Sequence, residues 1–242
     1  MPSVLMTLLL TIIASIAHAL PKGFVYLQSI SPDISEDMRY VSANNFIGRP
    51  ISGYQKGRCI LTSHAAYQLA EAEKEAQRLG YRLKVYDCYR PQRAVNDFYK
   101  WSQDPLDILM KNEFYPRENK ATLFSKGYIS KASGHTRGST VDLTLVKINN
   151  PTPLNKAPSV KCYSKTNQHT NDDSINTGTR FDCLDKSASV FYNDLTKEQL
   201  HNRLMLRNLM KRHGFYPYEK EWWHFTLKNE PYPSTYFDFP VR

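Results

Sequence analysis

The 242-residue sequence contains no internal repeat, no low-complexity linker and no dense run of basic residues. Without a repeat or linker, a chain of this length suits one domain or a tight pair with a sizeable core. Lysine and arginine outnumber aspartate and glutamate by 32 to 23, but they are scattered. Scattered positive charge favours solubility, and it argues against nucleic acid as a partner. With 41% hydrophobic and 23% charged residues, the composition excludes a disordered chain and a polytopic membrane protein.

Aspartate, glutamate, lysine and arginine are absent from residues 1–19. This apolar stretch is interrupted by polar residues and is too short for a comfortable membrane span. It ends in Ala-His-Ala, the small-x-small pattern of a signal peptidase site, and no cysteine follows to carry a lipid. We therefore expect a signal peptide at 1–19 and a single catalytic domain at 20–242, periplasmic or secreted. An uncleaved anchor is the alternative; after cleavage no stable membrane association is expected.

Only four cysteines are present, Cys59, Cys88, Cys162 and Cys183. None of them has the Cys-x-x-Cys spacing of a thiolate metal site. An even number behind an export signal indicates two disulfides formed in an oxidising compartment. Three pairings are possible, including Cys162 with Cys183, which would close one loop, and Cys59 with Cys88.

The spacing of apolar residues predicts a mixture of helices and strands without the regular βαβ alternation of a parallel sheet. Helices are expected over residues 65–79, 92–101 and 196–213. Strands are expected over residues 82–87, 140–146 and 222–227. The polar segment 149–189 is expected to be an ordered loop insertion. The fold class that follows is α+β, with a small antiparallel sheet flanked by helices.

Two segments contain residues suited to metal chemistry. His135 lies in a glycine-flanked turn, and the strand after it places Asp142 on its polar face. His224 ends a Glu-x-x-His motif that begins at Glu221. Two histidines and one aspartate, with a fourth position open, are typical of catalytic rather than structural zinc. His64, His169, His201 and His213 lack matching ligand partners, and we expect them at the surface or at helix ends.

Glu221 and Arg90 complete the expected chemistry. Positions i and i+3 of a regular strand face opposite sides, so Glu221 can lie beside a metal held by His224 only if the chain bends, or if Glu221 precedes the strand. That place suits a general base acting on water rather than a ligand. Arg90 follows a strand and precedes Pro91, which would hold its guanidinium rigidly where an oxyanion develops.

Together the two motifs resemble a known family, the zinc D-alanyl-D-alanine peptidases related to VanX. The motifs are Ser133-x-His135-x-x-Gly138-x-Thr140-x-Asp142 and Glu221-x-Trp223-His224. The similarity extends over nearly the whole mature chain, through residues 23–27, 38–40, 45–50, 89–96, 178–182 and 230–233. It implies an α+β fold shared with lysostaphin-type peptidases and the hedgehog signalling domain.

The resemblance also implies the reaction and the roles. By position, His135, Asp142 and His224 correspond to the ligands of one Zn²⁺ per chain. Glu221 corresponds to the general base, and Arg90 to the arginine that stabilises the transition state. The implied reaction is hydrolysis of the dipeptide D-alanyl-D-alanine to two D-alanines.

A dipeptidase must also recognise both ends of its substrate. We expect Asp182 to bind the ammonium group and Ser133 to bind the carboxylate, and the insertion to cover the cleft and exclude longer chains. Thr140, Thr177 and Cys88 depart from residues common in the family, which affects substrate fit rather than chemistry.

Two other functions remain open at this point. One is a D,D-carboxypeptidase acting on peptidoglycan stem peptides, and the other is a non-catalytic zinc-binding module. Zinc binding alone needs neither Glu221 nor Arg90, which argues against the module. Because an exported enzyme cannot drain the cytoplasmic D-Ala-D-Ala pool, recycling of cell-wall dipeptide is expected rather than antibiotic resistance. The oligomeric state is not implied.

Overall fold

The computed structural model describes residues 19–149, 161–166, 169 and 172–242. The expected signal peptide therefore lies, except for Ala19, outside the described residues. Within these ranges the helices are α1 (Ser63–Arg78), α2 (Gln92–Gln103), α3 (Lys111–Phe114) and α4 (Lys197–Arg212). The strands are β1 (Phe24–Tyr26), β2 (Ser35–Glu36), β3 (Ile60–Thr62), β4 (Tyr81–Asp87), β5 (Thr140–Lys147), β6 (Phe215–Tyr218) and β7 (Glu221–Leu227). None of these helices combines the length and apolarity needed to cross a membrane.

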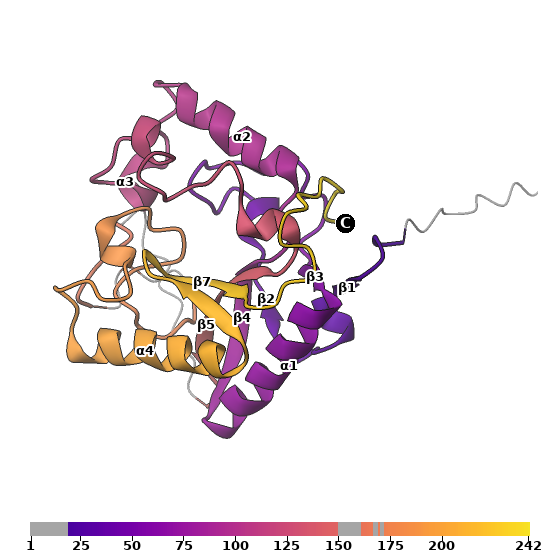
Figure 1. Ribbon diagram of the computed structural model, residues 1–242. Helices are drawn as coiled ribbons and strands as arrows, with labels where there is room; N and C mark the ends of the chain where they lie inside the picture. Colours follow the sequence, from indigo (N-terminus) through magenta and orange to yellow (C-terminus); the bar gives the residue numbers. More distant parts are fainter. Residues whose placement is uncertain (1–18, 150–160, 167–168, 170–171) are drawn as a thin grey trace, which may run out of the picture.

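A five-stranded sheet with the order β2-β4-β5-β7-β6 forms the centre of the molecule (Figure 1). The pairs β4–β5, β5–β7 and β6–β7 are antiparallel, as expected. The edge strand β2 is only two residues long and pairs parallel to β4, so the sheet is antiparallel apart from this edge. Strands β1 and β3 form a separate antiparallel pair. The α+β class expected from the sequence is confirmed.

Helices α1 and α4 pack against each other and against the sheet, whereas α2 lies on the opposite side of the molecule (Figure 1). α1 begins two residues before its expected start because the Thr62 hydroxyl accepts a hydrogen bond from the Ala65 amide at 3.4 Å. α4 begins with the predicted capping box, in which Thr196 and Gln199 bond each other's backbone amides. Strand alternation places Asp142 on the face of β5 away from Val141 and Leu143, and all three are buried.

Both disulfides are present, and they join Cys59 to Cys88 and Cys162 to Cys183. The first connects the residue before β3 to the residue after β4. The second closes a loop within the insertion.

The insertion at 149–189 lies partly outside the described residues. Its described part is mostly buried and is ordered by contacts with the domain. Asp172 accepts hydrogen bonds from Arg39 at 2.6 Å and from Tyr86 at 2.7 Å, which ties the insertion to β4. His169, expected at the surface, is fully buried instead. The expectation was wrong because a polar sequence does not reveal that its backbone is folded against the domain.

Candidate active site

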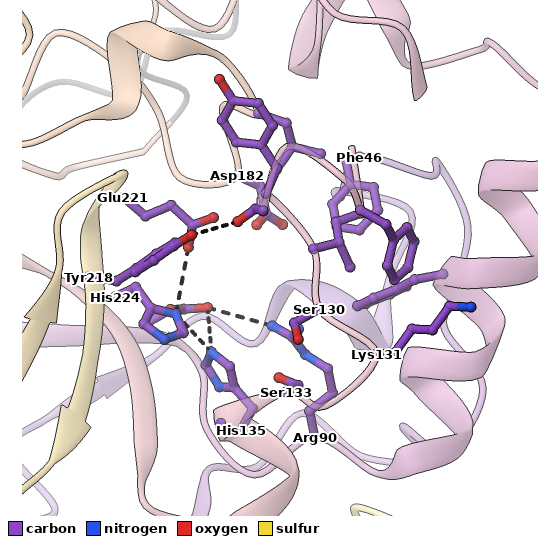
Figure 2. A pocket seen from close by; sticks show the side chains of 18 of the residues that line it. Phe46, Arg90, Ser130, Lys131, Ser133, His135, Asp182, Tyr218, Glu221 and His224 are labelled. Atoms are coloured by element: carbon purple, nitrogen blue, oxygen red, sulfur yellow. Dashed lines mark hydrogen bonds and ion pairs between the residues drawn. The ribbon is translucent and has the colours of Figure 1, made fainter. Parts of the chain in front are cut away.

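The structure brings the three expected ligand residues to one point, and Figure 2 shows two of them, His135 and His224, side by side. Asp142 on β5 and His224 on β7 are direct cross-strand partners, and His135 comes from the short 3₁₀ helix Gly134–Arg137 before β5. Nε2 of His135 lies 3.2 Å from Oδ2 of Asp142, and Nδ1 of His224 lies 3.0 Å from Oδ1 of the same carboxylate. One ligand atom from each residue lies within 4.8 Å of the others.

The hydrogen bonding of this triad fits a bound cation. Nδ1 of His135 donates to the Cys88 carbonyl oxygen at 2.7 Å, so its Nε2 presents a lone pair, 3.3 Å from Nδ1 of His224. Oδ1 of Asp142 is buried and has no hydrogen-bond partner of good geometry. Converging lone pairs repel one another unless a positive ion lies between them. Two imidazole nitrogens and a carboxylate oxygen are a donor set that zinc accepts, and a histidine held by a carbonyl is typical of metal ligands.

Electrostatics at the triad agree with this interpretation. Burial alone would raise the pKa of the Asp142 carboxyl, but His135 and His224 beside it hold that pKa well below its usual range. Burial lowers the pKa of His224 despite its contact with Asp142. The lowered pKa of Asp142 favours its carboxylate and the lowered pKa of His224 favours its neutral imidazole, and these are the forms that bind a metal.

Glu221 lies at the same point because β7 is irregular. Pro217 of β6 pairs with Phe225, but the next residue, Tyr218, pairs with Glu221. Three β7 residues are thus accommodated between adjacent pairs, which is the bend that the Glu-x-x-His spacing requires. Oε2 of Glu221 lies 3.6 Å from Nδ1 of His224. Burial, together with the charges of Asp142 and Asp182, raises the pKa of the Glu221 carboxyl well above its ordinary value.

Arg90 is held from several sides. Its Nε donates to Oδ2 of Asp87 at 2.9 Å, and its guanidinium lies over the rings of Tyr40 and Phe98 at 5.1 and 5.2 Å. Its Nη2 reaches within 3.7 Å of Oδ2 of Asp142. The side chain is therefore a fixed cation at the edge of the triad, as its position before Pro91 suggested.

Asp182 and Ser133 both line the cavity that contains the triad. Asp182 has a left-handed backbone conformation, with φ of 59°, and it accepts a hydrogen bond from the Tyr40 hydroxyl at 2.9 Å. Burial raises the pKa of its carboxyl well above the ordinary value. Figure 2 shows Asp182 near Glu221, with Ser133 and Arg90 across the cavity.

The cavity has a volume of about 600 Å³, and both polar and apolar residues line it. The polar residues include the triad, Glu221 and Asp182, and the aromatic and apolar residues include Phe46, Phe98, Phe124 and Ile129. Within the described ranges, its lining includes Phe98 of α2 and no residue of α1 or α4. The site therefore occupies the face of the sheet that α1 and α4 leave uncovered.

Asp87 and the aromatic residues around Arg90 belong to the site, although the motifs in the sequence did not indicate them. Asp87 is fully buried, and it accepts hydrogen bonds from Tyr54 at 2.6 Å and from Arg90. Asp87 shares one face of the expected strand with Leu83 and Val85, and an acidic residue on this apolar face was a usable signal. Tyr40 and Phe98 gave none, because an aromatic residue in a loop or on a helix is ordinarily part of a core.

Comparison with known proteins agrees with this geometry. The family described as D-Ala-D-Ala dipeptidase matches residues 21–156 and 162–242. The chain is 36% identical to a D-alanyl-D-alanine dipeptidase of Enterococcus faecium over 220 residues, which cover 91% of this chain and 98% of that protein. It is likewise 36% identical to the D-alanyl-D-alanine dipeptidase of Streptomyces coelicolor, over 90% of this chain and 98% of the relative. The protein of the same name from Escherichia coli is 28% identical over 84% of this chain and 83% of its own length. The resemblance seen in the motifs is thereby confirmed, and the chain belongs to the D-Ala-D-Ala dipeptidase family of peptidases.

Proposed function

We propose that this chain is an exported zinc dipeptidase that hydrolyses D-alanyl-D-alanine to two molecules of D-alanine. The observation that carries the proposal is the convergence of His135, Asp142 and His224 within 4.8 Å, with Glu221 3.6 Å from His224. The names of the relatives, each a D-alanyl-D-alanine dipeptidase, support the substrate.

His135, Asp142 and His224 would hold the metal through Nε2, a carboxylate oxygen and Nδ1. When bound, zinc supplies Lewis-acid polarisation of a carbonyl oxygen and lowers the pKa of water. The carboxylate of Glu221 accepts one proton from the attacking water. It then donates this proton to the amine nitrogen that leaves when the peptide bond breaks.

Arg90 and Asp182 would act on the substrate itself. The Arg90 guanidinium donates hydrogen bonds to the oxygen that becomes negative in the transition state, and its contacts with Asp87, Tyr40 and Phe98 fix it before reaction. Asp182 accepts from the substrate ammonium group. Such a cation offsets the cost of burying this carboxylate, to which the Tyr40 hydroxyl donates a hydrogen bond. Ser133, at the opposite side of the cavity, donates to the substrate carboxylate.

Asp182 also favours a dipeptidase over a D,D-carboxypeptidase. In a peptidoglycan stem peptide the nitrogen of the penultimate residue is an uncharged amide, which offers no charge to a buried carboxylate. Comparing D-Ala release from the free dipeptide and from a pentapeptide separates the two functions. We expect hydrolysis of the dipeptide alone, and release from the pentapeptide alone would overturn the assignment.

Export is part of the proposal. The signal pattern at 1–19 and the two disulfides support it, because disulfides persist in oxidising compartments. An enzyme outside the cytoplasm would act on dipeptide released from the cell wall, so recycling is its proposed role. N-terminal sequencing of the protein from periplasmic and cytoplasmic fractions tests this: a mature chain starting at Leu20 outside the cytoplasm is expected, and a full-length cytoplasmic chain would contradict it.

A further inference from the structure

The carbonyl oxygen that orients His135 belongs to Cys88, a half-cystine. Nδ1 of His135 donates to this oxygen at 2.7 Å, and Cys88 is bonded to Cys59. Both cysteines are fully buried. The disulfide therefore lies one hydrogen bond away from an expected metal ligand.

The sheet does not hold Cys88 in place. The last β4–β5 pair is Asp87 with Asp142, and a register shift precedes it. On the other side of β4, pairing with β2 ends at Val85. Cys88 thus follows the end of both ladders, where strand hydrogen bonds no longer fix its carbonyl.

Two neighbouring segments support Cys88 instead: the Arg90 amide donates to the His135 carbonyl oxygen at 3.3 Å, and the Cys59 segment makes the remaining contacts. The amide of Tyr89 donates to the Ile60 carbonyl oxygen at 2.9 Å, and the disulfide joins the residues just before these two. Cys59 is itself fixed, since its amide donates to Oε2 of Glu36 at 3.1 Å and its carbonyl oxygen accepts from the Leu27 amide at 2.9 Å.

We infer that the Cys59–Cys88 disulfide is a positioning element of the metal site, which holds the Cys88 carbonyl where it fixes the ring and tautomer of His135. The inference rests on the proposed metal-dependent function. A partner that orients a ligating histidine typically contributes 10–100-fold to metal affinity or activity. Opening this disulfide should therefore weaken zinc binding, beyond any effect on folding stability.

The second disulfide provides a matched control. Cys162–Cys183 spans 21 residues and Cys59–Cys88 spans 29, so loop closure predicts similar contributions to stability. Among the residues that the structure describes, no hydrogen bond joins Cys162 or Cys183 to the triad; Sγ of Cys162 lies 3.6 Å from the Phe114 carbonyl oxygen. If both disulfides only stabilise the fold, removing either one should change zinc affinity by the same factor.

The experiment compares the Cys59→Ala/Cys88→Ala and Cys162→Ala/Cys183→Ala variants of the mature chain. Zinc affinity is measured by competition with a fluorescent chelator, and melting temperature is measured on the metal-free proteins. We expect zinc affinity to fall by roughly 10–100-fold in the first variant and by less than about twofold in the second. Equal zinc affinities in the two variants would overturn the inference.

Reduction of folded protein covers the case in which the first variant does not fold. In the Cys162→Ala/Cys183→Ala background only Cys59–Cys88 remains. A phosphine then reduces this bond to two thiols, taking up the oxygen of water as phosphine oxide while the sulfurs acquire two protons. Mass spectrometry after alkylation confirms opening. Release of zinc to EDTA should accelerate about tenfold or more, and an unchanged rate would refute the inference.

These measurements do not depend on dipeptide hydrolysis. If zinc affinity follows the disulfide but D-Ala-D-Ala is not cleaved, the proposed substrate fails and the inference stands. If the dipeptide is cleaved and zinc affinity is the same with and without the Cys59–Cys88 disulfide, only the inference about the disulfide is wrong. Because thiols stay reduced in the cytoplasm, a confirmed dependence would also mean that the metal site is completed only after export.

Discussion

Asp142 and His224 face each other across adjacent antiparallel strands, with Nδ1 of the histidine 3.0 Å from Oδ1 of the carboxylate. The register of the β5–β7 pair therefore brings together two residues that are 82 positions apart in the chain, as their numbers show. A slip of one residue would turn one of them to the other face of the sheet. The candidate metal site thus depends directly on strand register.

Removing one member of this pair should abolish metal binding. In His224→Ala, two ligands remain and the charge of Asp142 loses its nearest partner. We expect zinc affinity to fall by well over the roughly 100-fold typical for loss of a residue that only orients a ligand. His201→Ala, a change at an exposed histidine of α4, is the control. Titration calorimetry with zinc measures both, and equal affinities would contradict the ligand assignment.

Glu221→Gln should separate chemistry from binding. The amide keeps the size of the side chain but cannot accept the proton of water, so kcat should fall by roughly 10²–10⁴-fold. Zinc content should stay at one per chain and KM should change little. Glu219→Gln, which changes a half-exposed carboxylate paired with Arg207, is the matched control. Undiminished hydrolysis by the Glu221 variant would remove the general-base role.

Arg90→Lys tests the transition-state contact. Lysine keeps the charge but loses the planar donors that bond Asp87 and reach toward Asp142. We expect kcat to fall by roughly 10²–10³-fold, the range for loss of one oxyanion donor, with KM affected less. Arg93→Lys, at an exposed arginine paired with Asp238, should remain close to wild type. A loss confined to KM would assign Arg90 to substrate binding instead.

Asp182→Asn tests recognition of the substrate ammonium. Losing one partner of a buried charge pair costs about 2 kcal/mol or more, so kcat/KM for D-Ala-D-Ala should fall by about 30-fold or more. N-acetyl-D-Ala-D-Ala, which lacks the ammonium, should be hydrolysed poorly by wild type and no worse by the variant. A parallel loss on both substrates would indicate a structural role for Asp182.

Folding stability should depend on pH through His169. Burial lowers the pKa of this imidazole to about 4, against about 6.5 in an unfolded chain. Below about pH 6.5 the His169 imidazole of the unfolded chain binds a proton, whereas the buried imidazole of the folded chain stays neutral down to about pH 4. The free energy of unfolding should therefore decline as pH falls from about 6.5 to about 4, by at most about 3.4 kcal/mol, and level off below.

The comparison is between wild type and His169→Gln by urea denaturation at several pH values, with His201→Gln as an exposed control. In the His169 variant, the free energy of unfolding should no longer decline between about pH 6.5 and 4. In the His201 control it should decline as in wild type. An identical slope in all three proteins would show that other groups cause it.

Much of the fold was predictable because its larger elements are regular. The apolar spacing of α1 and α4, with the capping box at Thr196, gave their positions to within two residues. Strand β5 alternates clearly, so Asp142 was assigned to the correct face. The two-residue strand β2 gave no periodic signal, and its parallel pairing depends on the rest of the fold.

The part of the site that consists of short sequence motifs could be predicted. The part that depends on tertiary contacts could not. The segments around His135 and Glu221 carry recognisable motifs and lie together as expected. The bond from His135 to the Cys88 carbonyl involves a backbone atom, and no side-chain pattern can indicate it. The contacts that fix Arg90 come from Tyr40 and Phe98, which are far from it in the sequence or indistinguishable from core residues.

The most direct test of the proposed mechanism is titration of the metal-free chain with zinc while D-Ala-D-Ala hydrolysis is followed. Activity should be absent without metal, rise in proportion to added zinc, reach its plateau at one zinc per chain and disappear again with chelator. Full hydrolysis by protein that contains no metal, or zinc bound equally well after His135, Asp142 and His224 are all replaced by alanine, would contradict it.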